Sequence, residues 1–225
     1  MIPIRDENRV KTFPIMVILI ILTNVAVFVW HWFTGLNPEA IIFRFGAIPW
    51  EITHFREIPN LPAAHHTGYP GLITLFTSMF LHGGLLHLLG NMLYLWVFGD
   101  NVEAVTGHLR FPVFYILCGL VAAAAHIGME PNSEIPMVGA SGAISGVLGA
   151  YMVKFPKARI HLLFWFIIFI RVIRVPAVLA LGLWFAFQVL SGMGKLGGGG
   201  GVAWFAHIGG FVAGAVLVFI FQKKR

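Results

Sequence analysis

Six apolar segments follow one another along the chain, and polar or basic connections separate them. They cover approximately residues 14–33, 84–98, 111–127, 141–153, 175–190 and 202–221. A helix needs roughly 20 apolar residues to cross a bilayer, so the shorter segments imply local bilayer thinning or shelter by neighbouring helices. Only 11% of the residues are charged, whereas a soluble domain averages about 25%. The pattern predicts an all-α polytopic membrane protein built as a bundle of six transmembrane helices.

The basic residues are distributed unevenly between the connections. If the N-terminus is inside and the chain crosses six times, the inner side holds Arg5, Arg9, Lys11, Arg110, Lys154, Lys157, Arg159, Arg171, Arg174, Lys223, Lys224 and Arg225. Only Arg44, Arg56 and Lys195 fall outside. The positive-inside rule therefore predicts that both termini are cytoplasmic. We expect residues 1–13 to be a cytoplasmic N-terminus, 14–222 one membrane domain, and 223–225 a basic cytoplasmic tail, in the inner membrane of a prokaryotic cell.

Several segments allow other interpretations. The first apolar segment has no small-residue cleavage site after it, so we expect a retained span rather than a signal peptide. Residues 160–170 are apolar but too short to span, and we predict an interfacial or re-entrant segment. A seventh span there is the alternative, but it would place the termini on opposite sides. The connection 34–83 is long and aromatic, which favours a location partly in the interface.

Polar side chains occur in three of the apolar segments, at similar depths. Ser141 begins the fourth segment, and His207 lies about five residues into the sixth. His82, His87 and Asn91 lie at or just before the start of the second. All three segments run inward in the predicted topology, so these residues share the outer half of the membrane. Polar groups at such depth are costly, which makes them candidates for a functional site.

Each residue alone has a simpler interpretation. A serine between small residues, as in Gly139-Ala140-Ser141-Gly142, is most often a helix cap or a packing site. A lone histidine can be an interhelical hydrogen-bonding residue. His82 and His87 are five positions apart, which is poor spacing for two metal ligands on one helix face. His87 and Asn91 are four apart and share a face, as catalytic groups or as interhelical hydrogen-bonding residues would.

The serine and the histidine together suit a nucleophile and its base. A serine hydroxyl is a weak nucleophile until a base accepts its proton, and histidine suits that role near neutral pH. The nearest acids, Glu130, Glu134, Asp100 and Glu103, lie in a loop or at the inner end of the second segment. The pattern therefore predicts a Ser–His dyad rather than a triad. Backbone N–H groups at the start of the fourth helix, with Asn91, would stabilise an oxyanion.

Small residues repeat at four-residue spacing in the fourth and sixth segments. The two series are Gly142, Gly146 and Ala150, and Ala206, Gly210 and Gly214. Such spacing lets helix backbones approach closely. We therefore expect the fourth and sixth helices to pack directly against each other.

Three motifs, in their order along the chain, resemble those of the rhomboid intramembrane serine proteases, and the resemblance covers nearly the whole chain. They are His82-Gly83-Gly84-Leu85-Leu86-His87-Leu88-Leu89-Gly90-Asn91, Gly139-Ala140-Ser141-Gly142, and Ala206-His207-Ile208-Gly209-Gly210 with Gly214 beyond. The resemblance implies a rhomboid-like bundle in which Ser141 is the nucleophile and His207 the general base. It also implies that His87 and Asn91 help to form the oxyanion hole.

The remaining motif residues would have supporting roles, and two features depart from some family members. His82, Gly139, Gly142 and Gly210 are the supporting residues. Some rhomboids carry an aromatic residue four positions after the nucleophile, stacked on the base, where this chain has Ser145. Some carry a Trp-Arg pair in the first loop, which residues 71–76 lack. The imidazole must then be oriented by another group.

These observations predict an intramembrane serine endopeptidase that cuts transmembrane-helix substrates near the outer membrane face. We expect transmembrane proteins and the lipid bilayer as partners, and no nucleic acid, cofactor or metal. The alternative is a catalytically silent rhomboid-like protein that binds or chaperones membrane helices, against which the presence of both Ser141 and His207 argues. A transporter or channel is disfavoured because the segments lack charges and repeats.

Substrate helices need an opening in the bundle, so some element must move. We expect the fifth segment and the loop after it, which contains the glycines 197–201, to be that element. The alternative is that the glycines are only a passive linker. The fifth segment holds no residue of the predicted catalytic set, and Gln188 is the one polar residue near its outer end.

Overall fold

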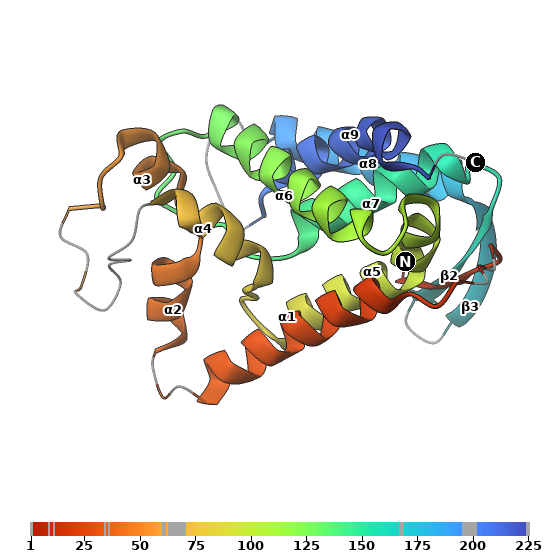
Figure 1. Cartoon of the computed structure of the whole chain (residues 1–225), viewed down its shortest axis with the longest axis horizontal. Coiled ribbons are helices and arrows are strands. Elements are labelled where there is room, and N and C mark those ends of the chain that lie inside the picture. The colour runs from red at the N-terminus through yellow and green to blue at the C-terminus, as the bar shows by residue number, and fades with distance from the viewer. Residues whose placement is uncertain are drawn as a thin grey trace.

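A computed structural model describes residues 2–8, 10, 12–33, 35, 37–59, 62, 71–166, 169–194 and 202–223 of the chain. The helices are α1 (Ile15–Phe33), α2 (Pro38–Phe45), α3 (Pro49–His54), α4 (Gly71–Thr77), the 3-10 helix η2 (Ser78–Phe80), α5 (Leu85–Thr106), α6 (Arg110–Met129), α7 (Ser141–Lys154), α8 (Ala177–Gly194) and α9 (Trp204–Phe221). Three strands, β1 (Ile2–Asp6), β2 (Arg159–Phe166) and β3 (Phe169–Pro176), lie at one end of the bundle (Figure 1). The glycines 197–201, expected to form a hinge, lie outside the described residues.

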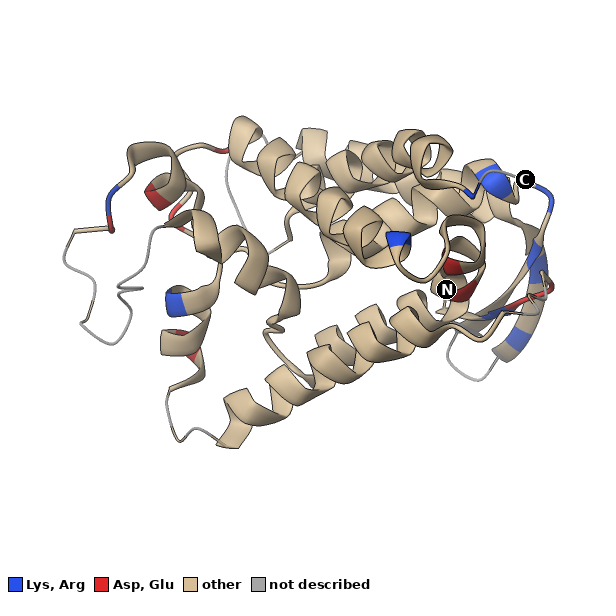
Figure 2. Cartoon of the chain, viewed as in Figure 1, with Lys and Arg blue, Asp and Glu red and all other residues tan. Residues whose placement is uncertain are grey.

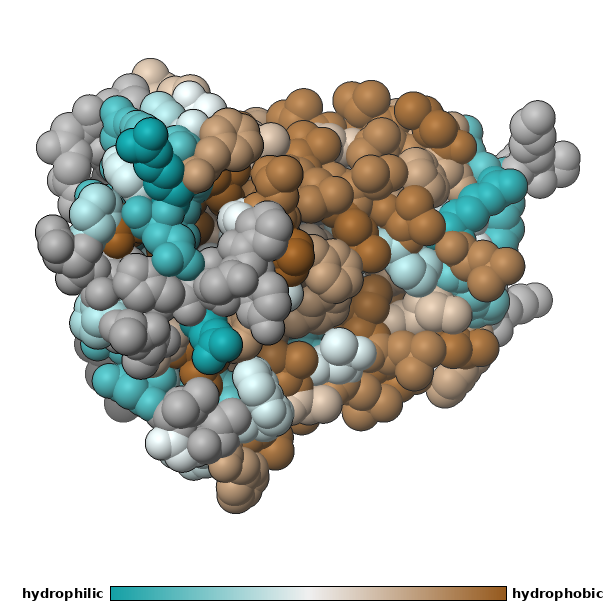
Figure 3. Space-filling view, turned by 60° about the vertical axis from the view of Figure 1, so that its left-hand side comes forward, coloured by the Kyte–Doolittle hydropathy of each residue, from teal (hydrophilic) through white to brown (hydrophobic). Residues whose placement is uncertain are grey.

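A helix lies in each of the six apolar segments, but they differ in length. Within the described ranges, α1, α6, α8 and α9 are each long and apolar enough to cross a membrane. Helix α5 adds a fifth candidate if it forms one span with α4 and η2, from which it is bent by 78°. Helix α7 has only 14 residues. Apolar residues form a broad belt between two more hydrophilic ends (Figure 3). The chain is therefore a mostly helical integral membrane protein.

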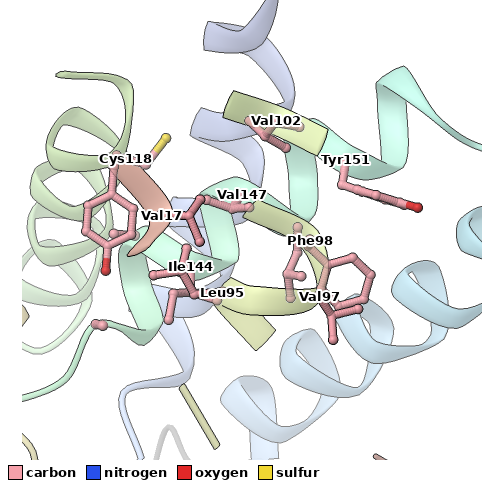
Figure 4. Packing of buried hydrophobic residues seen from close by; sticks show 14 of the residues in the cluster. Val17, Leu95, Val97, Phe98, Val102, Cys118, Ile144, Val147 and Tyr151 are labelled. Carbon is pink, nitrogen blue, oxygen red and sulfur yellow. The ribbon is translucent and has the colours of Figure 1, made fainter. Parts of the chain in front are cut away.

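Helix α7 lies at the centre of the bundle, which explains how so short a helix is accommodated. Every residue from Ala143 to Tyr151 is buried. Its Val147 packs in one cluster with Val17 of α1, Leu95 of α5 and Cys118 of α6 (Figure 4). A helix that is apolar all round and covered on all sides belongs to the core of a bundle. Its neighbours therefore shield α7 from lipid, and it need not match the bilayer thickness.

Helices α7 and α9 touch backbone to backbone along a seam of glycines. A Cβ added to Gly210 would lie 2.1 Å from the carbonyl oxygen of Gly142, and one added to Gly214 would lie 1.8 Å from that of Gly146. Both distances are far below van der Waals contact, so a side chain at either position would push the helices apart. The close packing predicted from the small-residue series is confirmed. We call these four glycines the α7–α9 seam.

The segment after α7 forms strands, which the sequence analysis does not predict. Strands β2 and β3 pair antiparallel, with Ile160 opposite Val175. Strand β1 pairs with β2 on the other edge, with Asp6 opposite Ile160. The all-α prediction thus misses a small sheet. Its third strand comes from the far end of the sequence, and an isolated hairpin is only marginally stable without such a partner.

We call the end of the bundle with the sheet the inner end, and the opposite one the outer end, after the topology predicted from the sequence. Buried polar groups hold the inner end together. The Glu103 carboxylate on α5 accepts hydrogen bonds from the backbone N–H groups of Met16 (3.0 Å) and Val17 (2.9 Å), in the first turn of α1. A carboxylate there satisfies N–H groups that the helix cannot pair itself and complements the positive end of its dipole. Asp6 accepts from Tyr151 on α7 and from Asn101 on α5. Burial raises the pKa of Asp6 above its ordinary value, although both hydrogen bonds act in the opposite direction.

Both chain ends approach this inner end. The backbone N–H of Lys223 donates to the Val105 carbonyl (2.9 Å), which places the end of α9 beside the end of α5. Strand β1 lies at the same end (Figure 1). Lysines and arginines gather there, while the opposite end carries few of them (Figure 2).

The opposite end is formed by the described part of the connection between α1 and α5. Helices α2 and α3 pack against the loop that precedes α7. The backbone N–H of Trp50 donates to the Ser133 carbonyl (3.0 Å), the Thr53 hydroxyl donates to that of Pro131 (2.8 Å), and Ala47 pairs with Met137. The connection therefore fixes the loop that leads to Ser141.

Candidate active site

Ser141 is the first residue of α7, and the turn before it has a special backbone conformation. Gly139 has φ +123°, in the region that favours glycine. A Cβ at this position would lie 2.8 Å from the His87 Nε2 atom and 3.6 Å from the Asn91 Nδ2 atom. Gly139 therefore serves two needs, the turn and the close approach of two side chains from α5. The start of α7 therefore lies against these two polar groups.

His207 lies in the first turn of α9 and faces Ser141 across the α7–α9 seam. Its Nε2 atom is 2.8 Å from the Ser141 Oγ atom, within hydrogen-bond distance. The seam sets this distance, because Gly210 and Gly142 let the two helices approach at the level of the pair. The structure thus brings together the serine and the histidine that the sequence analysis singled out.

The second ring nitrogen of His207 has a partner that the sequence analysis did not assign to the site. The Nδ1 atom is 2.8 Å from Oε1 of Gln188, a residue of α8 that is only 4% exposed. The set of site residues predicted from the sequence contains none from α8, so Gln188 is an addition that comes from the structure. Gln188 was visible in the sequence as the one polar residue near the outer end of its segment, but only the fold shows which group it meets.

Aromatic rings flank the imidazole, although none follows the serine at the fourth position. The Trp184 ring on α8 has its centroid 6.0 Å from that of His207, and the Trp204 ring on α9 lies at 6.4 Å and nearly perpendicular, at 87°. Ser145, which stands where some rhomboids have an aromatic residue, donates to the Ser141 carbonyl instead (2.7 Å). The base is therefore oriented from α8 and α9 rather than from α7.

The α5 side of the site offers hydrogen-bond donors. His87 and Asn91 lie beside the backbone of Gly139, which precedes Ser141 by two positions. The Nδ2 group of Asn91 is buried and has no hydrogen-bond partner among the described residues. The first N–H groups of α7 also lack partners within the helix. His82 packs edge-on against His87, with 5.1 Å between ring centroids, and so supports its position.

A cavity of about 890 Å³ opens around these groups. Ser141, His207 and Asn91 line it, and so do Tyr94 of α5 and Trp184 of α8. The loop before α7 forms its outer part, with Glu130 among the lining residues. The cavity can therefore hold a peptide segment and water next to the serine.

Among the described residues, the hydrogen-bond partners of the His207 imidazole are not carboxylates. Both ring nitrogens of His207 are within hydrogen-bond distance of other groups, Ser141 and Gln188. Glu130 lies near a different histidine, His126, at 3.9 Å. In the described part of the chain, no cluster of three His, Cys, Asp or Glu residues could hold a metal ion. The chemistry that this geometry supports is proton transfer from a serine to an imidazole.

Comparison with known proteins identifies the fold family. A family model described as the Rhomboid domain matches residues 70–224. Rhomboid protease GluP of Bacillus subtilis is 36% identical over 147 residues, which cover 64% of this chain and 25% of that protein. RHOMBOID-like protein 4 of Arabidopsis thaliana is 33% identical over 146 residues, 65% of this chain and 33% of that protein. Rhomboid protein 1, mitochondrial, of Saccharomyces cerevisiae is 31% identical over 158 residues, 67% and 42% of the two chains. The chain thus spans less than half of the length of each of these relatives.

Proposed function

The chain belongs to the rhomboid family, and we propose that it is an intramembrane serine protease that works through a Ser141–His207 dyad. The observation that carries the proposal is the 2.8 Å contact between Ser141 Oγ and His207 Nε2 inside a cavity. A half-buried hydroxyl and imidazole at hydrogen-bond distance are the arrangement that base-activated nucleophiles require. The name of one relative includes the word protease, which is in keeping with this activity.

The proposed reaction has two halves. Ser141 Oγ attacks the carbonyl carbon of the substrate peptide bond while its proton passes to His207 Nε2. The imidazolium then gives that proton to the leaving amine as the C–N bond breaks, and an acyl-enzyme remains. A water molecule, deprotonated by the same Nε2, attacks the acyl carbon. The proton returns to Ser141 Oγ as the C–O bond breaks and the new carboxyl product leaves.

The oxyanion of each tetrahedral intermediate would lie near the start of α7. The donors that we assign to it are the backbone N–H groups there, with Asn91 Nδ2 and His87 from α5. Asn91 Nδ2 is buried and without a partner among the residues described, so it is free to bind the charge that develops. One such donor typically contributes about 3 kcal/mol to the transition state. Gly139 and Gly142 would support the site by letting α5 and α6 approach it closely.

The substrate class follows from the location of the site in an apolar belt. We assign single-span membrane proteins whose helix unwinds at small or helix-breaking residues, because a peptide bond within an intact helix is covered by its neighbours. The cavity is lined on one side by α5 and on another by α8, so the substrate would enter between these two helices. The cut would fall near the outer membrane face.

We further propose a topology of six spans, formed by α1, α5, α6, α7, α8 and α9, with residues 14–222 as one membrane domain. Both termini would be cytoplasmic, in keeping with the basic residues at the end where β1 and the last turn of α9 lie (Figure 2). A prokaryotic inner membrane remains our expectation for the location, although relatives include a mitochondrial protein. Cysteine labelling from outside, in a Cys118→Ala background, tests this. A cysteine at position 224 should stay unlabelled in intact cells, and labelling there would overturn the layout.

The experiment for the activity is cleavage of a transmembrane substrate in liposomes by purified protein. Ser141→Ala and His207→Ala should each abolish cleavage, because one removes the nucleophile and the other its base. The matched control is Ser145→Ala, which removes a neighbouring hydroxyl on the same helix that donates to the Ser141 carbonyl. Full cleavage by Ser141→Ala would refute the proposal. Binding of the substrate without cleavage by the wild type would favour the non-enzymatic alternative.

A further inference from the structure

Gln188 is a buried polar residue on a helix whose other faces are apolar. Leu183, Phe187 and Leu190 of α8 are 68%, 59% and 69% exposed, so their sides face the surroundings of the bundle. Gln188 is 4% exposed and belongs to the buried side of the helix, with Leu181 and Gly192. Burying an amide is costly unless it is hydrogen-bonded. The contact that the structure gives it is the one with His207 Nδ1, at 2.8 Å.

The contact between Gln188 and His207 determines which ring nitrogen carries the hydrogen, and this matters if His207 is a base. If Nε2 is to accept the Ser141 proton, the single ring hydrogen of neutral His207 must be on Nδ1. An amide oxygen facing Nδ1 accepts that hydrogen and thereby favours this tautomer. It also fixes the rotation of the ring, so that Nε2 stays directed at the serine. In hydrolases with a triad, a carboxylate has this orienting role.

We propose that Gln188 is the positioning residue of His207, and that it takes the place of a triad carboxylate with a neutral amide. This inference rests on the proposed function. It also gives α8 a second role, because the helix that borders the entry side of the cavity carries the group that orients the base. Displacement of α8 away from α9 would separate Gln188 from His207 and release the ring. The base would then be correctly oriented only while α8 is packed against α9.

The test compares three variants of the purified protein. Gln188→Leu removes the acceptor at similar size, Gln188→Glu restores an acceptor of the same length, and Gln222→Leu makes the same change at the chain's other glutamine, at the inner end. We expect Gln188→Leu to lower kcat by about 10- to 100-fold, since a buried donor loses its partner. KM should change less than twofold, because the amide does not touch the substrate. Gln222→Leu should keep full activity.

The pH profile separates positioning from packing. A carboxylate at position 188 favours the protonated imidazolium, so the base of Gln188→Glu stays protonated to higher pH. The acidic limb of its kcat profile should therefore move upward by about one pH unit or more, with activity at the optimum well above that of Gln188→Leu. A purely structural role would lower the activity of both variants alike, whether or not the limb moves.

The outcomes distinguish this inference from the proposed function. Activity of Gln188→Leu within twofold of wild type, while Ser141→Ala is inactive, would overturn the role of Gln188 and leave the dyad standing. Activity of Ser141→Ala would overturn the proposed function itself. If Gln188→Leu does not fold, the pH profile of Gln188→Glu decides alone. An upward shift with optimum activity close to that of the wild type supports the positioning role, and an unchanged limb or a loss of activity at the optimum contradicts it.

Discussion

Helix α5 buries one asparagine near each of its ends, and the two side chains differ in their hydrogen-bond partners. At the inner end, the Asn101 side chain donates to Asp6 (3.0 Å) and Asp100 (2.8 Å) and accepts from Asn8. At the outer end, Asn91 Nδ2 has no partner in the described part of the chain and lines the cavity beside Ser141. A buried amide with all its bonds made contributes to stability, whereas a buried donor left open is available to a ligand or an intermediate. The contrast separates a structural end from a reactive end.

The largest expected effect comes from exchanging these two asparagines for alanine. Asn91→Ala should lower kcat by about 100-fold, since an oxyanion donor is lost, with little change in the thermal unfolding midpoint. Asn101→Ala should do the reverse. It removes one of the hydrogen bonds that Asp6 accepts and the acceptor of Asn8 Nδ2, which costs about 1–3 kcal/mol, but the activity per folded molecule should stay. Cleavage assays and thermal unfolding of both proteins check this, and similar behaviour of the two variants would remove the distinction between the ends.

The two ends also differ in how far they could be predicted from the sequence. The outer residues come in local patterns, because Ser141, His87 with Asn91, and His207 each lie in a short motif that can be read without the fold. The inner contacts join residues far apart, such as Asp6 with Tyr151, and no local pattern marks them. The β1–β2 pairing was missed for the same reason. Gln188 lies between the cases: its burial in an apolar segment was visible, but its partner depends on how α8 packs against α9.

A second prediction concerns the α7–α9 seam, which joins the reactive end to the rest of the bundle. Gly214→Ala places a methyl group 1.8 Å from the Gly146 carbonyl oxygen, so the helices must separate. Overpacking of this kind costs about 1–3 kcal/mol or more, and activity should fall with stability because the Ser141–His207 distance depends on the seam. Gly182→Ala on α8 is the matched control, since a Cβ there meets no atom within 4 Å. If Gly214→Ala and Gly182→Ala have the same unfolding midpoint, the role of the seam in holding the two helices together is contradicted.

The smallest effect is expected at the inner sheet, where Glu7 accepts a hydrogen bond from His161 (2.9 Å). This bond, with Arg174 nearby, holds the pKa of Glu7 below its ordinary value. A carboxyl whose pKa is lowered by folding adds stability above its unfolded pKa, and the gain disappears as the pH falls through the folded value. The difference in unfolding midpoint between wild type and Glu7→Gln should therefore be present at pH 7 and vanish at more acidic pH. A difference that grows on acidification would have the wrong sign.

The central claim is that His207 activates Ser141, and covalent labelling tests it without any substrate. Purified wild-type protein in detergent is treated with a small fluorophosphonate, and the modified residue is located by mass spectrometry. We predict a single adduct on Ser141, none in Ser141→Ala, and strongly slowed labelling in His207→Ala because the serine proton has no acceptor. Labelling of His207→Ala at the wild-type rate, or an adduct that persists in Ser141→Ala, would contradict it.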